Sequence, residues 1–228
     1  MSNNSENRLR AVRESHLGWL VAIIILLIVV ADQWLKIWIK TNFYLGEDME
    51  ITSWFHLKFI ENNGFAFGIE WFNKYILTFG RIIAVILFCW AMKKLIVNSV
   101  KYSRGFFIAF ALIIAGAAGN IFDCIFYGEI FTNPMPPEVA EMFPTVGYAG
   151  WFEGRVVDML YFPLFTIEWP DWMPGIGGHR FEFFQYIFNI ADSAITVGVL
   201  MMIFFYSRQA SEAINYLFDK KKNSKKNS

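Results

Sequence analysis

The stretch HLGWLVAIIILLIVVADQWLKIWI, residues 16–39, is apolar for most of its length. A helix of about 20 apolar residues crosses the hydrocarbon core of a bilayer, because each residue adds about 1.5 Å of length. The stretch therefore predicts a membrane-spanning helix. Its second half contains two ionisable residues, Asp32 and Lys36, which a plain membrane anchor does not need.

Three further stretches have the same apolar character, at residues 75–92, 105–128 and 183–206. The composition agrees, since 56% of the 228 residues are hydrophobic. The first stretch is longer than the apolar core of a signal peptide and no Ala-x-Ala-like cleavage site follows it, so we interpret it as an uncleaved span. The sequence predicts an all-α membrane protein with four transmembrane helices, and one integral membrane domain over residues 1–228.

Basic residues gather in three segments, although the formal net charge is zero. They lie at residues 1–15, between the second and third spans, and in the tail at residues 207–228. The positive-inside rule makes these segments cytoplasmic. The connections at residues 41–74 and 129–182, which are rich in Asp and Glu, are then extracytoplasmic. The basic tail is typical of a solvated end that faces lipid headgroups, so we expect no nucleic-acid partner.

Several spans place polar residues toward the same, outer leaflet. The first span contains an Asp-x-x-x-Lys pair on one helix face, and the third and fourth each contain an Asn-x-x-Asp pair beside small residues. Ionisable groups within spans cost about 2.5–3.5 kcal/mol and usually face a protein interior or a wet cavity. Their convergence predicts a functional site, and the alternative is that they only join helices by hydrogen bonds. The residues are Asp32, Lys36, Asn120, Asp123, Asn189 and Asp192.

The residue types present narrow the chemistry. The sequence has no His-Glu-x-x-His run and no Gly-x-Ser-x-Gly elbow, so neither a zinc protease nor a serine hydrolase of that type is indicated. Two carboxylates near an apolar boundary can hold one proton between them, which is the arrangement of aspartic proteases. That chemistry requires no metal and no other cofactor. Taken alone, the residues favour Asp123 and Asp192 as the pair.

A transporter is the main alternative function. Intramembrane Asp, Lys and Asn also build proton- or cation-coupled transporters. Against it, the four spans show no inverted repeat with broken helices, and the polar groups gather at one leaflet instead of the midplane. A membrane scaffold whose polar groups only hold helices together is a third possibility.

The two outer connections differ in pattern. Residues 48–72 alternate apolar and polar side chains, which predicts a small antiparallel sheet at the membrane surface. The long connection at residues 129–182 is rich in Pro, Trp and Phe, and its segment PEVAEMF, residues 137–143, predicts a short helix. Its aromatic residues are typical of a membrane interface. A lid or an extra partner surface is the alternative.

Five motifs follow one another along the chain: DQWLK at residues 32–36, NNGFAFG at 62–68, GNIFD at 119–123, VVDM at 156–159 and FNIADS at 188–193. Together they resemble the lipoprotein signal peptidases, the type II signal peptidases of bacteria. The resemblance extends over all four predicted spans in order.

The resemblance implies an aspartic endopeptidase of the bacterial cytoplasmic (inner) membrane, with its active site at the extracytoplasmic face. Its substrates would be prolipoproteins already modified with diacylglycerol, cleaved just before the lipidated cysteine. We expect the enzyme to contact membrane lipid and to act as a monomer. The implied catalytic pair is Asp158 and Asp192, so Asp158, in an outer loop, takes the place of Asp123. The implied supporting residues are Asp32, Lys36, Asn62, Asn120, Asp123 and Asn189, with Asn63 as an alternative to Asn62.

One position departs from the family pattern. The family usually has Arg directly after the Asp of its Gly-Asn-x-x-Asp motif, whereas this chain has Cys124. We expect any role of that Arg to be lost or to pass to another cation, Arg155 or Arg81. Since Cys89 and Cys124 both lie in predicted spans, no extracytoplasmic disulfide is expected.

Overall fold

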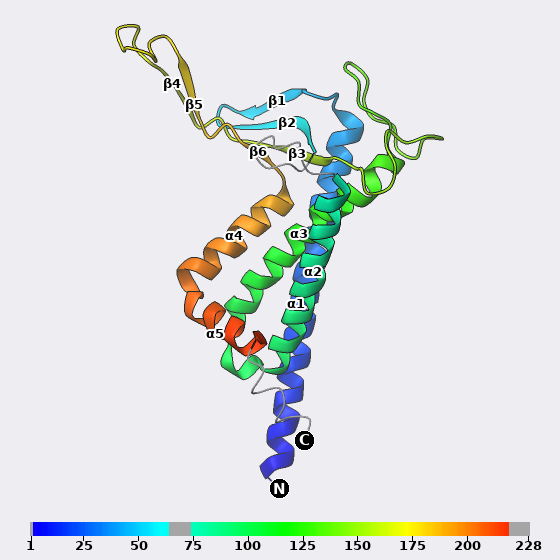
Figure 1. Cartoon of the computed structure of the whole chain (residues 1–228), viewed down its shortest axis with the longest axis vertical. Helices are drawn as coiled ribbons and strands as arrows, with labels where there is room; N and C mark the ends of the chain where they lie inside the picture. Colours follow the sequence, from blue (N-terminus) through cyan, green and yellow to red (C-terminus); the bar gives the residue numbers. More distant parts are fainter. Residues whose placement is uncertain (1, 64–73, 219–228) are drawn as a thin grey trace. The chain divides into compact units, whose positions relative to one another are not determined.

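The computed structural model describes residues 2–63 and 74–218, with side chains from residue 8 onward (Figure 1). The chain divides into two compact units. The described parts of residues 1–31, 79–119 and 191–228 form the first, which we call the helical unit. Residues 32–78 and 120–190 form the second, which we call the sheet unit because all the described strands lie in it. The motif residues 64–68 lie outside the described residues.

Within the described residues, three helices are long and apolar enough to cross a membrane, and they match the first three predicted spans. They are α1 (Ser2–Asn42), α2 (Lys74–Val97) and α3 (Arg104–Ile130). Helices α4 (Ile190–Phe205) and α5 (Ser207–Phe218) meet the same criterion only as a pair, and a bend of 97° separates them. The chain is therefore a multi-pass membrane protein, and its described residues contain three or four candidate spans.

The fourth helix begins later than the predicted start at residue 183. Phe183 pairs with Phe165, and Phe188 pairs with Leu160, in antiparallel ladders. These ladders use backbone groups that a helix would need for its own hydrogen bonds. The helix therefore starts only at Ile190.

Small residues let α3 and α4 approach each other closely in the helical unit. A side-chain carbon at Gly116 would overlap the carbonyl oxygen of Ala191, and one at Gly198 would lie 2.7 Å from the carbonyl oxygen of Ala109. Glycine at both positions is what such an approach requires in a membrane. The core of this unit is formed by Leu17, Val21, Met92, Leu95, Tyr102, Phe106, Phe107, Ala111, Ile114 and Ala213.

The antiparallel sheet predicted from residues 48–72 is present, and it is larger than predicted. Strands β1 (Asp48–Thr52) and β2 (Phe55–Asn62) form its first hairpin. Strand β3 (Val156–Tyr161) pairs with β2, and β6 (Ile187–Phe188) pairs with β3, which gives the order β1-β2-β3-β6. Two distant parts of the chain therefore build one sheet.

Asp158 lies on strand β3, not in a loop as the sequence suggested. It is paired in register with Ile60 of β2, and only 2% of its surface is exposed. Its neighbours Val157 and Met159 are buried too, so β3 is covered on both faces. A strand buried on both faces lacks the apolar–polar alternation that reveals a strand in sequence, and β3 was missed for that reason.

The long connection after α3 contains no helix within its described residues 131–189. Phe131 pairs with Met142, and Val139 pairs with Tyr44, so the segment predicted as a short helix is extended instead. Further along, β4 (Phe165–Glu168) and β5 (Arg180–Phe183) form a separate two-stranded hairpin.

The sheet unit has its own core, which joins the sheet to the ends of two helices. Aromatic and aliphatic side chains from the last turns of α1 and α3 pack on residues of β2 and β3. The buried members are Ile39, Phe43, Phe59, Tyr127, Phe131, Ala140, Val157 and Met159.

Candidate active site

A buried lysine lies between two buried aspartates in the sheet unit. Lys36 Nζ is 2.8 Å from Asp32 Oδ2 and 2.7 Å from Asp123 Oδ2, and all three side chains are fully buried. The ammonium group donates a third hydrogen bond to Asn120 Oδ1, at 2.9 Å. Since a lysine has three N–H donors, these acceptors match its capacity. The predicted pairing of Asp32 with Lys36 on one helix face is confirmed.

Both oxygens of Asp123 accept hydrogen bonds as well. Gln33 donates to Oδ1 at 2.7 Å, and the backbone N–H of Val157 donates to Oδ2 at 3.3 Å. Tyr127 donates to the amide oxygen of Gln33 at 3.0 Å and so orients it. Asp123 thereby links α1 and α3 to strand β3. Gln33 was not recognised from the sequence, since an uncharged residue beside Asp32 gives no separate signal.

Two asparagines extend this network toward the sheet. Asn120 Oδ1 accepts from Asn189 as well as from Lys36, with a distance of 3.2 Å to Asn189 Nδ2. Asn189 Nδ2 also lies 3.2 Å from the carbonyl oxygen of Val157 and 2.7 Å from Asp158 Oδ1. The network therefore runs from Lys36 through two amides to Asp158.

Asp158 lies between two amide side chains. Asn189 donates to its Oδ1 at 2.7 Å, and Asn62 donates to its Oδ2 at 3.4 Å. Of the two asparagines that the sequence left open, Asn62 ends strand β2 beside β3 and contacts Asp158, and its role at the site stays a prediction. Amide N–H donors hold a carboxylate in one orientation and stabilise its negative charge.

A second group of charged side chains forms ion pairs at the end of β2. Lys40 is buried and forms an ion pair with Glu61, whose other oxygen is 2.9 Å from Arg155 Nη1. Lys40 also lies over the rings of Phe131 and Tyr148, with 5.2 Å and 5.0 Å to the centroids. Glu61 directly precedes Asn62, so this ion-pair group fixes the strand end that supplies the amide to Asp158. It was missed because its members are far apart in sequence.

The same contacts show what surrounds Cys124, the residue that stands where the family usually has Arg. Arg155 pairs with Glu61, and the cation beside Asp123 is Lys36. Cys124 is buried, and its carbonyl oxygen accepts from the backbone N–H of Gly154 at 2.9 Å. The other cation considered from the sequence, Arg81, belongs to the helical unit, and its role stays a prediction.

Tyr148 and Tyr161, in the connection after α3, have pKa values above the ordinary value for tyrosine. Burial raises the pKa of Tyr148, whose hydroxyl accepts from the backbone N–H of Arg155 at 2.7 Å. Burial and the hydrogen bond to Glu182 raise the pKa of Tyr161 to about 12. A raised pKa stabilises the fold fully below the unfolded value of about 10. The contribution of Tyr161 is then lost as the pH rises from about 10 to about 12.

Asp192 lies in the first turn of α4, three residues after Asn189, and is half-buried. It belongs to the helical unit, whereas the other predicted site residues belong to the sheet unit. Its pairing with Asp158 stays a prediction. No group of three or more His, Cys, Asp or Glu side chains within residues 2–63 and 74–218 is arranged to hold a metal ion.

Comparisons with known proteins agree on one family. A family model described as signal peptidase (SPase) II matches residues 24–208. The lipoprotein signal peptidase of Porphyromonas gingivalis is 44% identical over 195 residues, which are 85% of each chain. That of Amoebophilus asiaticus is 38% identical over 189 residues, covering 79% of this chain and 74% of its own.

The fold is similar to that of a bacterial membrane enzyme. A solved structure of a bacterial membrane enzyme, 25% identical in sequence, superposes with a TM-score of 0.54 over 81% of this chain and 90% of its own. Nothing in these comparisons favours the transporter alternative. The family model and the relatives together cover most of the chain, and the chain belongs to the signal peptidase II family.

Proposed function

We propose that the protein is an aspartic endopeptidase that removes signal peptides from diacylglyceryl-modified prolipoproteins. It would cleave the peptide bond just before the lipidated cysteine, with Asp158 and Asp192 as the catalytic pair. The observation that carries the proposal is the setting of Asp158, which is held in place by two amides, next to a network in which Asp123 is committed to a lysine.

The contacts of Asp123 argue against it as the partner of Asp192. One of its oxygens is taken by Gln33, and the other by Lys36 and the backbone of β3. Both oxygens of Asp123 are thus already engaged in contacts that hold α1 and β3 to α3.

The proposed position of Asp192 suits an acidic catalytic group. The first turn of a helix has backbone N–H groups that point toward the N-terminus and stabilise negative charge. Asn189 directly precedes α4 and contacts Asp158, so the motif FNIADS supplies one residue to each side of the proposed pair. Asn189, which bonds to Asp158, lies only three residues before Asp192 in the chain, and this short spacing supports the proposed pair.

In the proposed reaction one aspartate is ionised and the other protonated. The ionised group takes a proton from a water molecule as the water oxygen attacks the scissile carbonyl carbon. The protonated group donates a hydrogen bond to the carbonyl oxygen and then gives its proton to the leaving nitrogen as the C–N bond breaks. The anchored lipid would place the scissile bond, so that binding energy away from the reaction orients the carbonyl.

The supporting residues would act by position. Asp32, Lys36 and Asp123 join α1, α3 and β3, while Asn120 and Asn189 connect that junction to Asp158. Asn62 would hold the second oxygen of Asp158. In this proposal the enzyme needs no metal or cofactor.

We further propose four spans, with α4 as the fourth, and both termini on the cytoplasmic side of the bacterial inner membrane. The distribution of Lys and Arg supports this orientation. The sheet unit and the active site would then lie at the extracytoplasmic face, where secreted prolipoproteins become accessible. We propose that a monomer surrounded by lipid is sufficient for activity.

The test is cleavage of a diacylated prolipoprotein by purified Asp158→Asn and Asp192→Asn variants in detergent, followed as a mass shift. Each variant should lose activity by about 10³-fold or more, because general acid–base catalysis contributes on that scale. Asp48→Asn, on the exposed strand β1, is the matched control and should cleave normally. Wild-type rates in either active-site variant would refute the proposed pair.

A further inference from the structure

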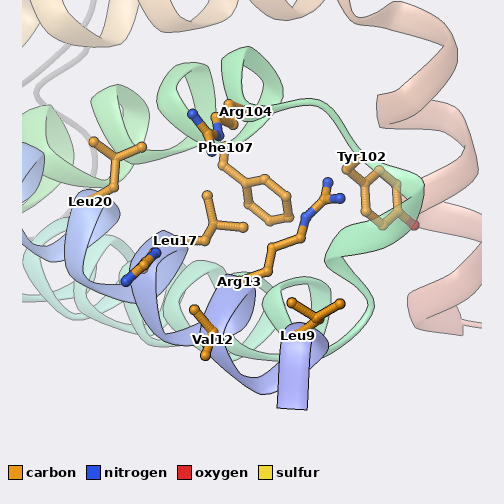
Figure 2. Close-up of a pocket in the computed structure, with 9 residues that line it drawn as sticks. Leu9, Val12, Arg13, Leu17, Leu20, Tyr102, Arg104 and Phe107 are labelled. Carbon is orange, nitrogen blue, oxygen red and sulfur yellow. The ribbon is translucent and has the colours of Figure 1, made fainter. Parts of the chain in front are cut away.

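The helical unit contains a cavity of about 500 Å³ that the peptidase function does not use (Figure 2). The first half of α1, the connection between α2 and α3, and the start of α3 line it. Its volume lies within the range of about 300–1,000 Å³ that is usual for sites of small ligands.

The lining of this cavity has two chemical parts. Leu17, Tyr102 and Phe107 are buried and form an apolar floor. Arg13 and Arg104 are exposed and form a basic rim, to which His16 adds a third nitrogen-containing side chain. A ligand that matches both parts must have a negative group joined to an apolar body.

Arg13 and Arg104 both line the cavity, and Arg13 is held there by a hydrogen bond. An Nη of Arg13 donates to the carbonyl oxygen of Ser99 at 3.1 Å, which ties the guanidinium to the connection before α3. Figure 2 shows Arg13 extending into the cavity between Phe107 and Tyr102. Arg104 is the first residue of α3, so its charge adds to the positive end of that helix. Guanidinium groups suit phosphate oxygens because they donate several N–H bonds in one plane.

The cavity also lies at the polar–apolar boundary of α1. The part of α1 before His16 contains Arg8, Arg10, Arg13 and Glu14, whereas the apolar run begins at Leu17. In a membrane-spanning helix that boundary coincides with the lipid headgroups. The basic rim is then at the depth of lipid phosphates, and the apolar floor is at the depth of the first acyl carbons.

We propose that this cavity binds an anionic phospholipid. Its phosphate would contact Arg13 and Arg104, and the start of an acyl chain would lie on Leu17, Leu20 and Phe107. A soluble phosphate would satisfy the rim but leave the apolar floor without a partner. The bound lipid would join α1 to the start of α3 at the membrane face that carries the N-terminus.

The proposal is tested by native mass spectrometry of the purified full chain with added phosphatidylglycerol, phosphatidylcholine or inorganic phosphate. Wild-type protein should retain phosphatidylglycerol in preference to phosphatidylcholine. The double variant Arg13→Gln/Arg104→Gln should bind phosphatidylglycerol about 30-fold more weakly, since each basic residue near a membrane surface contributes about fivefold. Arg104→Gln alone, at an exposed position, should show about fivefold weaker binding if the double variant does not fold.

The matched control removes two charges from the same membrane face outside the cavity. Lys93→Gln/Lys101→Gln should bind phosphatidylglycerol as wild type does, because neither lysine lines the cavity. Equal weakening in both double variants would indicate diffuse attraction and overturn the proposal. Retention of phosphatidylcholine as strong as that of phosphatidylglycerol, or inorganic phosphate that binds and competes equally well, would overturn the lipid assignment. Because lipid retention is measured, failure here is distinct from failure of the proposed peptidase chemistry.

Discussion

Asp123 and Asp158 are both buried in the sheet unit, but their hydrogen-bonding partners differ in charge. Asp123 contacts a buried ammonium group, a glutamine and a backbone N–H. Asp158 is held by the amides of Asn62 and Asn189. A single asparagine, Asn189, contacts Asp158 and also reaches the lysine network through Asn120.

Burial alone does not identify a catalytic carboxylate, since both aspartates are buried. An ion pair with every donor matched is suited to joining elements, since a change of charge on any member leaves the others without partners. We therefore propose that the neighbourhood of Asp123 serves stability and that of Asp158 serves catalysis, and each role can be tested separately.

The largest expected effect on stability follows from Lys36→Met. The substitution keeps the length of the side chain but leaves the carboxylates of Asp32 and Asp123 buried together without a cation. We expect a loss of about 3–5 kcal/mol in the free energy of unfolding, measured by denaturant titration in detergent. Lys93→Met, at an exposed position of α2, is the control. A loss below about 1 kcal/mol would mean that the lysine network is not what holds α1 and α3 to the sheet.

Lys40→Met should have about half that effect. Glu61 loses one cation but keeps Arg155, and the new side chain still packs against Phe131. We expect a loss of about 2 kcal/mol in the same titration. A loss as large as that of Lys36→Met would show that the two ion-pair groups are equivalent in stability.

Asn189→Ala tests the link between the two regions. The variant removes the 2.7 Å hydrogen bond to Asp158 and the contacts to Asn120 and Val157. A hydrogen bond to a charged group is worth about 1.5–3 kcal/mol, so the cleavage rate should fall by about 10- to 100-fold. The measurement is kcat and KM with a diacylated prolipoprotein. A change confined to KM would indicate that Asn189 binds substrate and does not orient Asp158.

Asn62→Ala should have the smallest effect, because its hydrogen bond to Asp158 is 3.4 Å long and weak. We expect a fall of about threefold to fivefold in kcat. Asn63→Ala, at the next residue, is the matched control and should leave the rate unchanged. A larger fall in kcat for Asn63→Ala than for Asn62→Ala would mean that Asn63 supplies the amide that bonds to Asp158.

The sequence predicted the elements whose signal is local. Three long helices follow from their apolar runs, and the β1–β2 hairpin follows from alternation between residues 48 and 62. Spacing of four residues was enough to pair Asp32 with Lys36. The start of α4 was misplaced because residues 183–188 are as apolar as a helix but pair as strands.

What the sequence did not reveal depends on contacts between distant segments. Asp158 could be assigned to strand β3 only through its pairing with β2, about a hundred residues earlier in the chain. The ion pair of Lys40 with Glu61 and Arg155 joins three segments that no spacing rule connects. The role proposed for Asp158 came from the family resemblance, since the residues taken alone favoured Asp123.

The most direct measurement compares Asp123→Asn and Asp158→Asn in one experiment that records both cleavage rate and unfolding free energy. Asp158→Asn should lose about 10³-fold or more in rate with a change in stability of about 1 kcal/mol or less. Asp123→Asn should lose about 1–3 kcal/mol, because one amide oxygen cannot replace two carboxylate oxygens, yet its folded fraction should cleave within about tenfold of wild type. If Asp123→Asn abolishes cleavage while Asp158→Asn retains it, the assignment of chemistry to Asp158 is wrong.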